Sequence, residues 1–335
     1  MDSARNRHRV VKRVEQEHKA EMKKGKQCWT SIAISLVVLI GSTTSCATTT
    51  KPREPAQPPA VPEEKAVPPT GTVKVNDISI YYEIHGEGEP LVLIMGWTFN
   101  SAHWLVQLPA LSEKYRVVVF DNRGTGRSDK PDGPYTMEMM AGDTAGLLDS
   151  IDIDAAHIYG ISMGGMIAQE FALRYPHKVT SLILGSTTCG GPNSIPSAPH
   201  VDQEAAERTP EENIRANLES IWSQEFIDNN PDLVEQHIAA TLEYPTPTCG
   251  RLGQQKAVWA HDTHDRLSQT KAPTLVIAGS ADELVPVENS KILASRIPDA
   301  ELVILKDAPH HFFTHTLEEA NKIILGFLGR HPCPR

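Results

Sequence analysis

From residue 91 onward, short apolar runs alternate with longer segments in which apolar residues recur at helical spacing. Each run has the length of one strand, and each longer segment could form a helix that returns the chain to the same edge of a sheet. This alternation predicts a parallel, doubly wound sheet covered by helices on both faces. The predicted strands are 91–95, 117–120, 157–159, 182–184, 274–278 and 302–305, and the predicted helices are 102–111, 137–150, 163–174, 287–296 and 317–328.

Two segments depart from the alternation. Val73–Ile84 has a strand-like pattern interrupted by Asn-Asp, which predicts an antiparallel hairpin ahead of the parallel strands. Between the runs at 182–184 and 274–278 the chain is mostly helical in character, with joints rich in Gly and Pro, and is too long for a simple connection. The predicted organisation is a core of residues 72–189 and 271–335 with an inserted helical cap at 190–270.

A Gly-x-Ser-x-Gly motif, Gly160-Ile-Ser-Met-Gly164, lies where a predicted strand meets a predicted helix. A serine at such a sharp turn is held above the sheet, and the glycines let the strand and helix backbones pass each other. The first turn of the helix offers free N–H groups where an oxyanion develops. We therefore expect Ser162 to be a nucleophile, in preference to a simple helix cap.

A serine hydroxyl needs a histidine base, and the histidine needs an acid to orient it. Asp282 follows a predicted strand, where a doubly wound sheet places functional loops, and we favour it over the adjacent Glu283. Two histidines, His310 and His311, follow the last predicted strand. The residues alone leave the choice between them open.

Together these motifs resemble the α/β-hydrolase fold superfamily over residues 72–330. The resemblance implies a mostly parallel, doubly wound, eight-stranded sheet with a cap. The family's Gly-His before aromatic residues aligns with His310-His311-Phe-Phe, so the resemblance assigns the base to His311. Leu91–Thr98 resembles the family's oxyanion loop with Met95 in place of histidine, which implies an oxyanion hole formed by the main-chain N–H groups of Trp97 and Met163.

Other residues are assigned to the pocket or to structure. Asp121–Ser128 also matches a loop of the family, and we interpret it as a turn fixed by an Arg123 ion pair. Aromatic side chains on segments expected to border the site suggest an apolar pocket. The candidate pocket residues are Trp104, Trp222, Trp259 and Phe312.

The nucleophile narrows the chemistry. Haloalkane dehalogenases and epoxide hydrolases with similar sheets carry aspartate at this turn, so Ser162 favours acyl transfer, usually to water. The leading hypothesis is a serine esterase or lactonase that acts on a small, apolar carboxylic ester or lactone. Carbon–carbon bond hydrolase, thioesterase, acyltransferase and perhydrolase activities use the same three residues and stay open. A ligand-binding protein on a hydrolase scaffold is the alternative from another class. We expect no metal and no organic cofactor.

The N-terminal segment predicts export. Residues 1–27 carry nine Lys or Arg and four Asp or Glu, and an apolar run at 32–40 follows, too short to span a bilayer. Small residues then lead to Cys46, which resembles a bacterial lipoprotein cleavage site. We therefore expect a signal segment at 1–45, a lipid on Cys46 and a membrane-associated protein of the cell envelope. An uncleaved anchor and a cleaved signal without lipid are the alternatives. The sequence leaves open whether translation starts at Met1 or at Met22.

Composition supports the remaining expectations. Residues 46–71 are rich in proline and predict an extended tether. The net charge of −10 disfavours nucleic acid as a partner. Because an exported protein meets oxidising conditions, a disulfide between Cys189 and Cys249 is a further hypothesis.

Overall fold

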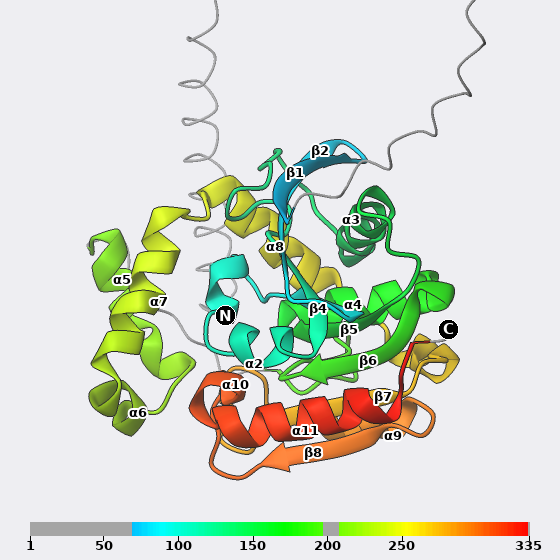
Figure 1. The fold of residues 1–335 in the computed structure, drawn as a ribbon. Coiled ribbons are helices and arrows are strands. Elements are labelled where there is room, and N and C mark those ends of the chain that lie inside the picture. The colour runs from blue at the N-terminus through cyan, green and yellow to red at the C-terminus, as the bar shows by residue number, and fades with distance from the viewer. Residues whose placement is uncertain (1–68, 197–207, 334–335) are drawn as a thin grey trace, which may run out of the picture. The chain divides into compact units, whose positions relative to one another are not determined.

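The computed structural model describes residues 69–196 and 208–333, which contain one eight-stranded sheet with the order β1-β2-β4-β3-β5-β6-β7-β8 (Figure 1). β1 and β2 form the antiparallel hairpin, β2 pairs with β4 antiparallel, and the other neighbours are parallel. The predicted sheet is therefore confirmed. The strands are β1 Thr70–Val75, β2 Ile78–His85, β3 Glu89–Ile94, β4 Tyr115–Phe120, β5 Ala156–Ile161, β6 Val179–Gly185, β7 Thr274–Gly279 and β8 Glu301–Leu305.

Helices cover both faces of the sheet, as the near-continuous apolar character of the parallel strands requires. One core cluster joins the sheet to α3, α4 and α9, and a second joins its other face to α2, α10 and α11. The helices of the core are α2 Leu108–Ser112, α3 Met137–Ser150, α4 Met163–Arg174, α9 Glu288–Arg296, α10 Phe312–His315 and α11 Leu317–Arg330, with short 3-10 helices η2 Ser101–Trp104 and η3 Pro176–Lys178.

Two sequence predictions need correction. β1 begins at Thr70, which pairs with Glu83, so residues 70 and 71 belong to the sheet and not to the tether. The single helix predicted at 102–111 is two short helices, η2 and α2. Pro109, in the first turn of α2, has no N–H for a hydrogen bond back to residue 105, and proline is tolerated in the first turn of a helix but not in its interior, which favours a new helix starting here.

The segment between β6 and β7 contains a separate group of helices: α5 Pro210–Ala216, η4 Leu218–Ser220, α6 Gln224–Asn229, α7 Pro231–Glu243, α8 Thr248–Ala260 and η5 His264–Gln269. Figure 1 shows α5, α6 and α7 grouped at one side of the sheet. They have a small apolar cluster of their own around Trp222, Val234 and Ile238. An antiparallel bridge between Gly190 and Asp262 joins the two ends of the segment.

The hypothesis of a disulfide between Cys189 and Cys249 is wrong in this structure, where both thiols are free. Cys189 is buried with its Sγ against the Gly190 carbonyl, whereas Cys249 Sγ faces the carbonyl of Lys130. The two cysteines therefore have different neighbours. The signal segment, Cys46 and nearly all of the tether lie outside the described residues. None of the helices within residues 69–196 and 208–333 is long and apolar enough to span a bilayer.

Candidate active site

Ser162 occupies a strained turn between β5 and α4. Its φ of 55° and ψ of −122° are rare for a residue with a side chain. The two motif glycines are required by contact: a Cβ on Gly160 would overlap the carbonyl of Gly164, and a Cβ on Gly164 would overlap the carbonyl of Ile94. The chain can therefore turn this sharply only with glycine at both positions.

Neighbouring strands fix the backbone of this turn. The Ser162 N–H donates to the Gly185 carbonyl at 2.9 Å, and the Thr187 hydroxyl donates to the Ser162 carbonyl at 2.7 Å. Gly96, in the loop after β3, lies directly beside the serine, because a Cβ at this position would stand 3.7 Å from Ser162 Oγ. Ser162 itself is half-buried, so its hydroxyl is held at the surface of a rigid turn.

Asp282 and His310 form a buried pair at the same edge of the sheet. His310 Nδ1 lies 2.8 Å from Asp282 Oδ2, and the other carboxylate oxygen accepts from the Val285 N–H at 2.8 Å. The Asp282 side chain is fully buried. The loops after β7 and β8 are joined, because the Ala281 N–H donates to the Ala308 carbonyl. The carboxylate thus fixes the orientation of the His310 ring.

The assignment of the base to His311 is contradicted by this geometry. The His311 N–H donates to the carbonyl of Ile221 in the cap, and its ring packs against Phe99, Trp222 and Phe313, away from Asp282. Consecutive side chains leave the backbone in different directions, so only one of the two histidines can face the acid. The family's usual glycine before the histidine is replaced here by a second histidine. The sequence pattern therefore could not distinguish His310 from His311 as the base.

The candidate oxyanion loop is tied to the cap helix α8. Trp97 Nε1 donates to the Arg251 carbonyl at 3.1 Å, and the Thr98 N–H donates to Gln254 Oε1 at 2.9 Å. Gln254 is fully buried, and its amide nitrogen donates to the Arg123 carbonyl at 3.0 Å. Sequence reasoning missed Gln254, because a glutamine in a helical stretch carries no signal that it contacts a distant loop.

Close backbone contact supports the same junction. A Cβ on Gly250 would overlap the carbonyl of Gly124, and a Cβ on Gly253 would stand 2.7 Å from the Tyr135 ring. The ion pair predicted for Arg123 is present, with Nη2 2.8 Å from Asp143 Oδ1. The Asp121–Ser128 loop therefore has a structural role, because α8 packs directly against it.

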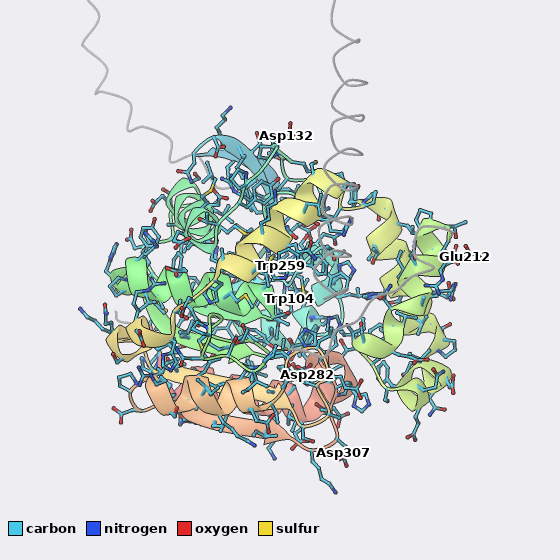
Figure 2. The ribbon with its side chains drawn as sticks, turned by 180° about the vertical axis from the view of Figure 1, so that it is seen from behind. Trp104, Asp132, Glu212, Trp259, Asp282 and Asp307 are labelled. Carbon is cyan, nitrogen blue, oxygen red and sulfur yellow. The ribbon has the colours of Figure 1, made fainter. Side chains whose placement is uncertain are left out.

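Of the four predicted pocket aromatics, only Trp222 borders a cavity between cap and core. Trp104 is fully buried beside Tyr159 and Phe313, and Phe312 is fully buried against Gly185. Trp259 is 73% exposed on α8 (Figure 2). Trp104, Phe312 and Trp259 are therefore not pocket residues in this structure. The sequence shows that a segment carries an aromatic residue but does not show which way its side chain points.

The cavity beside Trp222 is small, about 30 Å³, and has histidines from both cap and core. His103, His237 and His311 all line it. Burial lowers the pKa of His103 to about 4. Burial, and then the neighbouring His103, lowers the pKa of His237 to about 3. Burial and the surrounding histidines hold the pKa of His311 well below its ordinary value. These three rings are therefore neutral at pH 7.

Known proteins share this architecture. The family model described as alpha/beta hydrolase fold matches residues 89–314. The putative carbamate hydrolase RutD of Azorhizobium caulinodans is 32% identical over 254 residues, which cover 76% of this chain and 96% of that protein.

Solved structures agree with the sequence relatives. The enol-lactonase from Burkholderia xenovorans LB400 superposes with a TM-score of 0.70 at 27% identity, covering 77% of this chain and all of that one. A thermophilic esterase from Thermogutta terrifontis gives a TM-score of 0.68 at 27% identity, with coverage of 78% and 99%. The chain belongs to the alpha/beta hydrolase fold family.

Proposed function

We propose that this hydrolase cleaves a small carboxylic ester or lactone through an acyl-enzyme on Ser162, with His310 as the base and Asp282 as its orienting acid. The buried hydrogen bond between Asp282 and His310 is the observation that carries the proposal. The serine turn adds support, because its strain and its glycine contacts have no purpose in a plain helix cap. A hydrolysis site needs all three residues, whereas a binding protein does not.

Each residue then has a defined step. His310 takes the hydroxyl proton as Ser162 Oγ attacks the carbonyl carbon, and Asp282 stabilises the imidazolium that forms. The N–H groups of Trp97 and Met163 stabilise the oxyanion. The alcohol leaves with the proton from His310, and water then hydrolyses the acyl-serine by the same sequence of proton transfers.

Turnover of an activated short-chain ester by wild type and by Ser162→Ala tests this function. We expect the variant to lose at least about 10³-fold in kcat while it stays folded. A fluorophosphonate should label wild type with one equivalent, located at Ser162 by peptide mass. Full turnover by Ser162→Ala would contradict the proposal and favour a different nucleophile.

A carbamate is the second candidate substrate, and the relatives favour it. Putative carbamate hydrolases from several bacteria match about three quarters of this chain, at 28–34% identity. A panel of esters, lactones and carbamates with the same alkyl group would separate the candidates by their kcat/KM. Esters or lactones preferred by tenfold or more would support the leading assignment, and a carbamate preference of that size would replace it.

We propose further that the protein is exported and anchored by lipid on Cys46. The support is the order of sequence features: a basic segment, a short apolar run, small residues before the cysteine and a proline-rich tether. Expressed in a bacterium, the wild type should partition with membranes and carry acyl chains on Cys46, and Cys46→Ala should accumulate as uncleaved precursor. Release of Cys46→Ala as a processed protein would indicate an ordinary secretory signal.

A further inference from the structure

Three side chains with metal-binding atoms meet at the amino edge of the parallel strands, far from the candidate active site. Glu89 is the first residue of β3, His157 is the second of β5, and Cys333 follows α11. One ligand atom from each lies within 4.8 Å of the other two. His157 and Ser162 stand at opposite ends of β5, roughly 16 Å apart at 3.3 Å per residue. The cluster is therefore separate from the chemistry at Ser162.

The two distances from His157 to the other ligands are close to those of a tetrahedral metal site. His157 Nε2 is 3.2 Å from Glu89 Oε2 and 3.9 Å from Cys333 Sγ. In tetrahedral zinc sites, bond lengths of about 2.0–2.3 Å place N and O ligands about 3.3 Å apart and N and S ligands about 3.6 Å apart. The histidine and carboxylate ligands already have this spacing, and Cys333 Sγ lies a few tenths of an ångström too far from the histidine.

The histidine is already oriented as a ligand. His157 is fully buried, and its other ring nitrogen, Nδ1, lies 2.8 Å from Ser181 Oγ. A hydrogen bond to the second nitrogen is the usual way in which a protein fixes a metal-binding imidazole. Glu89 is anchored as well, because its Oε2 accepts from the Cys333 N–H at 3.1 Å. The three donors are thus held together before any ion arrives.

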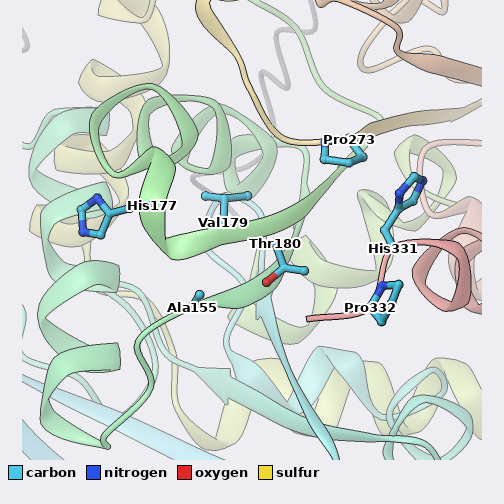
Figure 3. Close-up of a pocket in the computed structure, with 7 residues that line it drawn as sticks. All are labelled: Ala155, His177, Val179, Thr180, Pro273, His331 and Pro332. Carbon is cyan, nitrogen blue, oxygen red and sulfur yellow. The ribbon is translucent and has the colours of Figure 1, made fainter. Parts of the chain in front are cut away.

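Solvent reaches the cluster directly, because Glu89 and Cys333 are only half-buried, and a cavity of about 250 Å³ lies beside it. Thr180, His331 and Pro332 line this cavity (Figure 3), and the Thr180 hydroxyl lies 3.3 Å from Cys333 Sγ. Three protein ligands and an accessible fourth position match an open zinc site completed by water.

We propose that Glu89, His157 and Cys333 bind one divalent transition-metal ion of the zinc class. The mixed N, O and S donors favour Zn²⁺ or Co²⁺ over Mg²⁺ or Ca²⁺, which take oxygen ligands. On binding, the Cys333 thiol releases its proton to solvent and the sulfur bonds the metal. The ion would then join the C-terminal end of the chain to β3 and β5.

Titration of the purified full chain with Co²⁺ tests this site, because cobalt bound to a thiolate absorbs in the near ultraviolet. Cys333→Ser should lack the absorption of one thiolate-bound Co²⁺ per protein that Cys249→Ser keeps. Cys249→Ser is the matched control, at a half-buried cysteine outside the cluster. Each variant lacks one cysteine and keeps all the others, so a difference between them reports the thiolate of Cys333. Equal absorption in the two variants would overturn the proposal.

A second variant guards against loss of folding. Glu89→Gln removes a charge from a partly exposed side chain, and we expect it to weaken Zn²⁺ binding by about tenfold or more in calorimetry. Zn²⁺ should also raise the Tm of wild type but not that of Cys333→Ser. Unchanged affinity in Glu89→Gln together with an unchanged Tm in wild type would show that the three side chains form a hydrogen-bonded cluster without metal.

Discussion

At the scale of single residues, the two adjacent histidines after β8 give the sharpest prediction. His310→Ala should lower kcat by at least about 10³-fold, since Asp282 would have no imidazole to orient. His311→Phe keeps an aromatic ring among Phe99, Trp222 and Phe313 and should retain activity within about tenfold. Steady-state kinetics on one activated ester decides between them, and the reverse result would return the base to His311.

Glycines give a second prediction at this scale, this time about stability. Gly164→Ala would force a Cβ against the Ile94 carbonyl, so the free energy of unfolding and the activity should both fall. Gly326→Ala is the matched control. Gly326 is exposed in the middle of α11, and a Cβ there would meet only the flexible Arg330 side chain at 3.9 Å, so alanine should raise stability by about 0.5–1 kcal/mol. Denaturant unfolding of both variants measures the difference, and equal effects would contradict the steric argument.

Sequence alone predicted the contact between Asp282 and a histidine to within one residue. Ser162 and Asp282 were predictable because each follows the carboxyl end of a strand, and a parallel sheet places its functional loops at that end. The choice of His311 failed because the direction of a side chain in a loop depends on long-range contacts, here the Ile221 carbonyl in the cap. The contact of Gln254 and the positions of Trp104 and Trp259 could not be predicted for the same reason.

At the scale of elements, the contact of α8 with the candidate oxyanion loop predicts a catalytic effect from a residue in the cap. Gln254→Leu removes the acceptor of the Thr98 N–H and the donor to the Arg123 carbonyl, so the loop should lose its fixed geometry. We expect kcat to fall by about 10- to 100-fold. Lys256→Ala, exposed on the same helix, should have no effect, and equal losses in both variants would point to general destabilisation of α8.

The junction of η2, α7 and α10 predicts a dependence of stability on pH. The pKa values of His103 and His237, about 4 and about 3, lie below the ordinary 6.5, so the unfolded chain binds more protons than the folded one between these values. The free energy of unfolding should therefore fall as the pH falls from about 6.5 toward 4. His237→Phe should reduce this slope in urea unfolding, and an unchanged slope would show that His237 does not contribute to it.

At the scale of the whole molecule, the strand and helix order was predictable because alternating apolar runs leave few other folds. The start of the folded part was harder to place, since Thr70 and Gly71 follow prolines and have no apolar side chain. A chain that begins at residue 69 should be soluble, folded and as active as the full protein. A chain that begins at residue 78 lacks β1 and should unfold at a lower temperature, because β2 loses its partner and Val75 leaves the core. Calorimetry compares the two, and equal Tm values would mean that β1 is dispensable.

The glycine contact of α8 has a consequence for how this scaffold can acquire new specificity. α8 meets the core backbone to backbone at Gly250 and Gly124, so a larger residue at Gly250 would displace the helix that holds the candidate oxyanion loop. Residues 208–243 pack through apolar side chains around Trp222, and they contact the core through main-chain carbonyls, which any residue supplies, such as that of Ile221. Recombination between relatives should therefore tolerate a crossover near Pro245, exchanging the helices before it while α8 is inherited with the catalytic core.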